Sequence, residues 1–259
     1  MSYLKTYETL TEIVSITGKL YDKTAFALNI AGRRAGFTST SAFNDVVEFG
    51  TGVADIPVLS ASTLDIISSS ADDAAAGTGV RTVKATYLDS SNNLTVSSAI
   101  NLNGTTLVTS VLTGVNAILW LETETAGSSG RAAGNIRLRI NGGTVECEQI
   151  TAGSNKSLSA RFAVPAGYTA YIPNFRVHAL NNDQNARMQA TVNTLDRSLS
   201  SVYKVVSSAD VPTNTNSGKL LLPFLRFPEL SRIKFSTIAG GVGIAVRCDV
   251  SFVVILVQN

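Results

Sequence analysis

The chain has 259 residues, enough to bury a full-sized hydrophobic core in one large domain or in two smaller ones. Its formal net charge is +2 without any basic tract, which excludes the clustered positive surface of a nucleic-acid-binding protein. The longest apolar run, residues 252–257, is far too short to span a membrane. Because the N-terminus also lacks a signal-peptide core, we expect a soluble protein made in a cytoplasm. Only 15% of the residues are charged, so its surface should suit contact with other protein.

Residues 1–50 differ from the rest and are predicted to form an N-terminal arm that docks on a neighbouring surface. Their first part has apolar residues at near-helical spacing, but many β-branched residues weaken a helix there. Their second part alternates apolar with small or polar residues, as a short strand does. The residues expected to make the docking contact are Leu4, Tyr7, Leu10, Val14, Phe26, Leu28 and Ile30. An alternative of equal weight makes this stretch the first hairpin of the main domain.

Residues 71–120 contain the clearest pattern in the chain, that of a β-meander. Over residues 94–102 the even positions are mostly apolar and the odd positions are polar or small, which is the period of a half-buried strand. The loop 89–93 and the pair Asn103-Gly104 supply residues that tolerate a positive φ. Two strand-turn units are therefore expected here.

The rest of the chain has the pattern of strands separated by turns. Asn141-Gly142 joins two alternating runs, which is the strongest short-range signal for a hairpin. Pro223 and Pro228 confine their segment to an edge or a bend. Residues 244–256 form one long strand that ends apolar on both faces, so it should cross the centre of a sheet.

These patterns predict an all-β fold, an antiparallel β-sandwich of jelly-roll type with an extended N-terminal arm. Residues 1–50 would be the arm, and residues 51–259 the sandwich, as one domain or as two packed sub-domains. The predicted core consists of Leu94, Val96, Ile100, Leu102, Trp120, Ile136, Leu138, Phe162, Val246, Val250 and Phe252.

No group of residues has the spacing of a catalytic, cofactor or metal site. The one histidine, His178, has no histidine or cysteine at ligand spacing, and no nucleophile-elbow pattern occurs. Asp72 and Asp73 lack the interleaved oxygen ligands of a calcium loop and are interpreted as solvated turn carboxylates. Cys147 and Cys248 are expected to be buried free thiols rather than a disulfide. We therefore expect neither enzymatic activity nor a cofactor.

Several turn-rich segments follow one another in an informative order. They are Ser68-Ser-Ser-Ala-Asp72, Gly77-Thr-Gly-Val-Arg-Thr-Val83, Leu102-Asn-Gly-Thr-Thr-Leu-Val108, Ile150-Thr-Ala-Gly153 and Val164-Pro-Ala-Gly-Tyr-Thr-Ala-Tyr-Ile172. In this order they resemble segments of virion structural proteins of tailed bacteriophages, over roughly residues 60–180. Each segment is ordinary turn chemistry, so it is their shared order that carries the resemblance.

The resemblance implies a non-enzymatic structural component of a phage particle, made in the host cytoplasm and located in the virion. The expected role is a capsid decoration or auxiliary protein that binds the shell and self-associates. Its partners would be the major capsid protein or neck and tail proteins. The apolar residues of the arm need a partner surface, so we expect a homo-oligomer, with a trimer favoured. The alternative is a receptor- or glycan-binding module of a fibre or tail, using Tyr168 or Tyr171.

Overall fold

The computed structural model describes residues 25–37, 43–48, 63–140, 143–180, 184–191, 203–239 and 246–259. Within these ranges all regular secondary structure is β-strand, and every strand pairing is antiparallel. The predicted all-β, antiparallel class is confirmed. The described part of the chain forms no helix that could cross a membrane.

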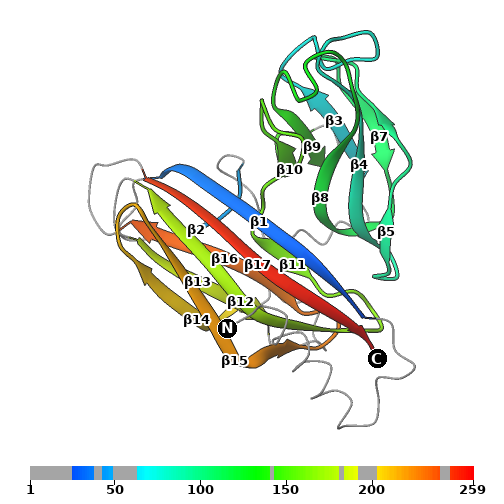
Figure 1. The fold of residues 1–259 in the computed structure, drawn as a ribbon. Helices are drawn as coiled ribbons and strands as arrows, with labels where there is room; N and C mark the ends of the chain where they lie inside the picture. Colours follow the sequence, from blue (N-terminus) through cyan, green and yellow to red (C-terminus); the bar gives the residue numbers. More distant parts are fainter. Residues whose placement is uncertain are drawn as a thin grey trace.

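The larger of two domains is a sandwich of a four-stranded sheet and a five-stranded sheet (Figure 1). Its main strands are β1 (Ala25–Phe37), β11 (Arg161–Ala163), β12 (Tyr168–Leu180), β13 (Gln184–Thr191), β14 (Tyr203–Val211), β15 (Thr215–Phe227), β16 (Arg232–Ala239) and β17 (Val246–Gln258). The sheet orders are β1-β17-β12-β15 and β11-β16-β13-β14, and the short β2 (Asn44–Asp45) pairs with β16. Numbered one to eight along the chain, these orders read 1-8-3-6 and 2-7-4-5. This is the strand order of a jelly roll, as predicted.

Aromatic rings join the two sheets in the jelly-roll core. The ring of Phe235 on β16 lies 5.1 Å from that of Phe175 on β12 and 5.0 Å from that of Phe252 on β17. On β17 the even positions point inward, because Val250 and Phe252 are each only 2% exposed. β17 lies between β1 and β12, so its predicted place inside a sheet is confirmed. β15, which contains Pro223, is an edge strand as predicted.

A second domain, the inserted domain (residues 63–156), lies in the sequence between the first and second strands of the jelly roll. Its strands are β3 (Leu64–Ser68), β4 (Val80–Asp89), β5 (Leu94–Val96), β6 (Ile100–Asn101), β7 (Val108–Leu112), β8 (Val115–Ala126), β9 (Ile136–Ile140) and β10 (Glu146–Ile150). One sheet has the order β10-β9-β3-β7, and in the other β4 pairs with β5, β6 and β8. The pairing of β9 with β10 confirms the hairpin predicted at Asn141-Gly142.

The two domains have separate hydrophobic cores, and two paired strands, β4 and β8, contribute residues to both. Ile118 and Leu121 of β8 belong to the core of the inserted domain. Ala117 and Leu119 of the same strand, with Leu88 of β4, belong to the jelly-roll core. Figure 1 shows the inserted domain as a distinct lobe beside the jelly roll. The lobe is therefore attached through apolar contacts as well as through the chain.

A buried carboxylate, that of Asp73, holds loops of the inserted domain together. Its Oδ1 accepts hydrogen bonds from the backbone N–H groups of Val80 at 2.8 Å and Ala133 at 2.9 Å. Its Oδ2 accepts from the hydroxyl of Ser68 at 2.6 Å and from the N–H of Gly134 at 2.8 Å. Asp73 is 0% exposed, so its interpretation as a solvated turn residue is wrong. Four donors replace the water that this carboxylate loses, which is why burial is tolerated.

Residues 25–37 of the predicted arm are a strand of the jelly roll. β1 pairs with β17 along its length, Ile30 is 5% exposed, and Phe26 and Leu28 pack partly buried against the core. This part of the chain therefore belongs to the main domain, as the alternative interpretation had it, although as a strand and not as a hairpin. Outside the described residues lie the other four proposed contact residues, Leu4, Tyr7, Leu10 and Val14.

Most of the predicted core is buried, but it divides between two cores. Seven of the predicted residues are buried: Ile100, Leu102, Ile136, Leu138, Phe162, Val250 and Phe252. The side chain of Val246 lies outside the described part of the structure. Leu94 and Trp120 are partly buried against the jelly-roll core. Val96 is 54% exposed, so its prediction is wrong. The alternation breaks after β5, where Ser97 turns inward and its hydroxyl accepts the N–H of Ala85 at 3.0 Å.

Candidate functional site

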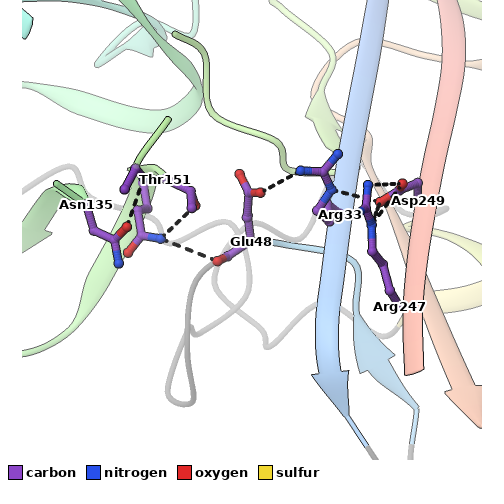
Figure 2. Close-up of polar contacts among 8 residues, drawn as sticks. Arg33, Glu48, Asn135, Thr151, Arg247 and Asp249 are labelled. Carbon is purple, nitrogen blue, oxygen red and sulfur yellow. Dashed lines mark hydrogen bonds and ion pairs between the residues drawn. The ribbon is translucent and has the colours of Figure 1, made fainter. Parts of the chain in front are cut away.

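A chain of polar contacts crosses from β17 of the jelly roll to the inserted domain (Figure 2). We call this chain of contacts the polar seam. Its members are Arg247, Asp249, Arg33, Glu48, Gln149 and Thr151. They come from β1, from β17, from the segment after β2 and from the end of β10, so the seam depends on the assembled fold.

On the jelly-roll side of the seam, Asp249 lies between two arginines. Strand register places Arg33 opposite Asp249, and its Nε donates to Asp249 Oδ1 at 2.9 Å. Arg247 donates to Asp249 Oδ2 at 2.7 Å from the same strand. Burial raises the pKa of Asp249, but hydrogen bonds from Arg247 and Arg33 and their charges outweigh burial and leave the pKa lowered. Asp249 is therefore ionised at neutral pH and its charge is matched locally.

Glu48 connects the jelly-roll side of the polar seam to the inserted domain. Arg33 donates to Glu48 Oε1 at 3.3 Å, and the side-chain amide of Gln149 donates to the backbone oxygen of Glu48 at 3.4 Å. The same amide donates to Thr151 Oγ1 at 3.0 Å. Burial raises the pKa of Glu48 by more than Thr151 and Arg33 lower it. The link between the domains thus contains a carboxyl group whose ionised form is disfavoured.

A second link, Glu148 with Arg161, is fully buried where β10 of the inserted domain approaches β11 of the jelly roll. Arg161 donates to Glu148 Oε2 at 3.2 Å and also to the backbone oxygen of Cys147. Glu148 Oε1 accepts from the Ser159 hydroxyl at 2.7 Å and from the N–H of Gln149 at 3.2 Å. Burial raises the pKa of Glu148. Such a pair adds little net stability, but the loss of either partner would leave an uncompensated buried charge.

Beside the seam, a cleft of about 410 Å³ opens on the outer face of the sheet β1-β17-β12-β15. His178, the histidine singled out from the sequence, lines this cleft together with Asp249 and Ser251. These are the residue types of a serine hydrolase triad. Among the described residues, however, no hydrogen bond joins the three, and the Asp249 carboxylate is bonded to arginines. The cleft does not have the geometry of an activated serine.

The two cysteines are free and buried, as predicted. Burial raises the pKa of both Cys147 and Cys248 to about 12, so both remain protonated thiols at neutral pH. In the described ranges no three His, Cys, Asp or Glu side chains are grouped as a metal site would need.

Sequence patterns did not identify the residues that join the domains. Neither Arg33 nor the Glu148–Arg161 pair belongs to any of the motifs found in the sequence. The only local signal was a charge inside a strand: Arg161 stands between apolar Ala160 and Phe162, and all three are buried. A charged residue in such a run needs a buried partner, but the sequence does not say which one.

The chain matches no family model and no curated protein. Its likeness to solved structures is weak. A structure of infectious bursal disease virus, Gx strain, is 12% identical, with 92% of this chain and 70% of that chain covered and a TM-score of 0.23. The VP2 subviral particle of the same virus has the same identity and coverage and a TM-score of 0.25. Its T=1 particles are 14% identical, with 92% and 68% covered and a TM-score of 0.22. TM-scores this low carry no argument, and the jelly-roll assignment rests on strand order alone.

Proposed function

We propose that this chain is a non-enzymatic structural protein of a virus particle of the tailed-phage type. The observation that carries the proposal is the strand order 1-8-3-6 and 2-7-4-5, because jelly rolls build many viral capsids. This is an analogy at the level of the fold, since jelly rolls also occur in lectins and cupins. The ordered resemblance of residues 60–180 to virion proteins of tailed phages supports the proposal independently of the fold.

The finer role that we propose is a capsid decoration or auxiliary protein that binds the major capsid protein and self-associates. The jelly roll would contact the shell and the inserted domain would form the outer lobe. The polar seam and the buried Glu148–Arg161 pair support this arrangement, because they hold the lobe in one orientation. A weakly charged surface, with 15% charged residues in the chain, suits protein contacts on both sides.

The test of the virion role is quantitative mass spectrometry of purified particles. We expect this chain in many copies per particle, in a fixed ratio to the major capsid protein. Separated heads and tails should be measured in parallel, and the chain should remain with the heads. Its absence from mature particles would overturn the proposal, and its presence in tails alone would overturn the decoration role.

Self-association is tested by light scattering on the full chain and on a variant that lacks residues 1–24. The deletion stops at residue 24 because β1, which starts at Ala25, is part of the jelly roll. We expect a trimer for the full chain and a smaller species for the variant. If both have the same mass and bind capsids equally, residues 1–24 are not an assembly segment.

The alternative role, glycan binding by Tyr168 or Tyr171, is not supported by the surroundings of these two side chains. The ring of Tyr168 packs edge-on against Phe26, with 5.8 Å between centroids, and is half-buried against the jelly-roll core, so it supports the core. Tyr171 is half-buried.

A further inference from the structure

The inserted domain has a cleft of its own, which we call the edge cleft. It has a volume of about 410 Å³, within the size range of small-molecule sites. One wall is formed by β4, the end of β5, residues 97–99 and β6, and the other wall is formed by β7. β5 and β6 pair with β4 on the edge opposite β8, and β7 is the last strand of the other sheet. The edge cleft therefore lies between the edges of the two sheets.

The edge cleft arises because both sheet edges are irregular. The pairing with β4 stops at Val96 and resumes at Ile100, so residues 97–99 leave the ladder. On the other edge, two steps along β3 correspond to four steps along β7, so β7 is bulged. In a regular strand Val108 and Val111 would face opposite sides, but on the bulged β7 both line the cleft. Bulges commonly re-aim side chains in this way at sheet edges and next to functional sites.

The irregular edges and the absence of charge limit what can bind in the edge cleft. An added β-strand needs a continuous row of backbone donors and acceptors, which a bulge and a break in the ladder both interrupt. The cleft therefore suits a compact ligand better than an extended peptide. Among the described residues that line it there is no Asp, Glu, Lys, Arg or His. An ion that entered the cleft would lose hydration without gaining a partner of opposite charge, so the ligand should be neutral.

Three polar side chains of the lining are available to a ligand. Ser98 and Asn101 are exposed, and Tyr87 is half-buried. In the part of the chain that the structure describes, none of these three side chains has a hydrogen-bond partner. Ser97 is different, because its hydroxyl accepts from the N–H of Ala85 at 3.0 Å and donates to the backbone oxygen of Ser98 at 2.7 Å. The available groups are thus an amide and two hydroxyls, each of which can donate and accept.

Apolar groups complete the lining of the edge cleft. Val96 is 54% exposed, and Val108 and Val111 are half-buried. The ring of Tyr87 adds an apolar body with a polar tip. Unlike Tyr168, whose ring packs against another ring, Tyr87 borders a cleft. A neutral sugar ring has the matching chemistry, because it presents C–H groups on its faces and hydroxyl groups that donate and accept around its rim.

We propose that the edge cleft binds a neutral saccharide, a hexopyranose without a carboxylate or an ammonium group. The C–H groups of the sugar pack on Tyr87 and the neighbouring valines, and its hydroxyl groups exchange hydrogen bonds with Asn101 and Ser98. The binding site belongs to the inserted domain alone and does not depend on the virion role proposed above.

The test is amide chemical-shift NMR on the full chain with methyl glycosides of glucose, mannose and galactose, and with D-glucuronate and D-glucosamine as charged comparators. We expect at least one neutral glycoside to shift the amides of residues 97–101 and 108–112, and to bind about tenfold more tightly than either charged sugar. If no neutral glycoside shifts these amides, or if a charged sugar binds equally well, the proposal is overturned. A peptide of alternating threonine and valine that binds there more tightly than the glycosides would make the cleft a strand acceptor and would equally overturn it.

Three variants locate the binding. Asn101→Ala should weaken binding of the neutral glycoside about tenfold, because it removes the amide that the sugar hydroxyls contact. Asn103→Ala is the matched control: it removes the same group from an exposed position two residues further on, which does not line the cleft. Binding should be unchanged in this control, and an equal loss in both would contradict the proposal. Val96→Lys places a positive charge at the rim, on an exposed position where folding tolerates it, and should make D-glucuronate the tighter ligand. An unchanged preference in this variant would place the ligand elsewhere and overturn the proposal.

Discussion

The jelly roll and the inserted domain reach a stable packing by different means. In the jelly roll, the rings of Phe175, Phe235 and Phe252 fill the space between long strands, and β1, β12 and β17 have 13 residues each. In the inserted domain β5 and β6 have only three and two residues, and the carboxylate of Asp73 joins the loops. Apolar packing is non-directional, whereas four converging hydrogen bonds fix one geometry.

This difference implies that the two domains respond differently to substitution. Loss of volume in the jelly-roll core is shared among many neighbours, which can relax in part. Loss of one oxygen of Asp73 leaves specific buried N–H groups without an acceptor, and no relaxation supplies another. The inserted domain therefore concentrates its vulnerability in one residue. The following predictions test that contrast, starting with the largest effect.

Val250→Asp should unfold the jelly roll. Val250 is 2% exposed, and an unpaired carboxylate in that core should cost at least about 5 kcal/mol of the free energy of unfolding. Circular dichroism and thermal unfolding measure the loss. Ser251→Asp, at the next and outward-facing position, is the control and should change stability by less than about 0.5 kcal/mol. A folded, soluble Val250→Asp protein would mean that the faces of β17 are assigned wrongly.

Arg161→Leu should destabilise the junction between the domains by about 3–5 kcal/mol, because Glu148 is then buried without its partner. The double variant Arg161→Leu with Glu148→Leu should recover most of this loss, because a buried pair can often be replaced by apolar residues at little cost. Urea unfolding of both proteins gives the comparison. A double variant as unstable as the single one would show that the pair stabilises the junction in its own right.

Asp73→Ala should cost about 3 kcal/mol and should act locally, because it removes the acceptor of four hydrogen bonds. Hydrogen exchange should increase in residues 68–80 and 131–135, while β12 and β17 keep their protection. Asp72→Ala removes an exposed carboxylate one residue away and serves as the control. Equal loss of protection in both domains would show that the molecule unfolds as one unit and not as two.

The smallest effect expected is a pH dependence at the polar seam. Because the folded-state pKa of Glu48 is raised above its ordinary value of 4.5, the folded protein binds a proton there more readily than the unfolded chain. Stability relative to Glu48→Gln should therefore rise as the pH falls from 7 towards 4.5. The pKa of Asp249 is lowered, so Asp249 acts in the opposite sense. Its contribution to the stability of the folded protein is lost only when the pH falls below about 3.8, its ordinary pKa. The test is to measure the unfolding midpoints of the unaltered protein and of Glu48→Gln between pH 7 and pH 4.5. If the stability advantage of the unaltered protein falls as the pH falls, the prediction is wrong.

Local chemistry was enough to predict the parts of the fold that depend on neighbouring residues. The β9–β10 hairpin, the interior place of β17 and the edge place of β15 all follow from turn residues, apolar runs and prolines. The prediction failed at Val96, the last residue of β5, which is exposed while the next residue, Ser97, turns inward. The insertion of one domain into another could not be predicted, since it depends on which strands pair over long distances.

The site depended even more on distant pairing. Arg33 and Asp249 are 216 positions apart, and only the register of the first and last jelly-roll strands brings them together. Asp73 was expected to be solvated because the residues around it lack the interleaved oxygen ligands of a calcium loop. Its partners Ala133 and Gly134 are backbone donors 60 and 61 positions away, and a backbone N–H leaves no signature in residue type.

Because β1 pairs with β17, the order of synthesis sets the order in which the chain can fold. The inserted domain is complete once residue 156 has left the ribosome, and its loops can close on Asp73 at that point. β1 must wait for about 100 further residues before its partner exists, which takes about 5–20 s at typical rates of translation. During that interval a 13-residue strand with one apolar face is without its partner strand. A finished lobe that lies between β1 and the rest of the jelly roll in the chain can hold such a strand apart from other nascent chains before the jelly roll closes.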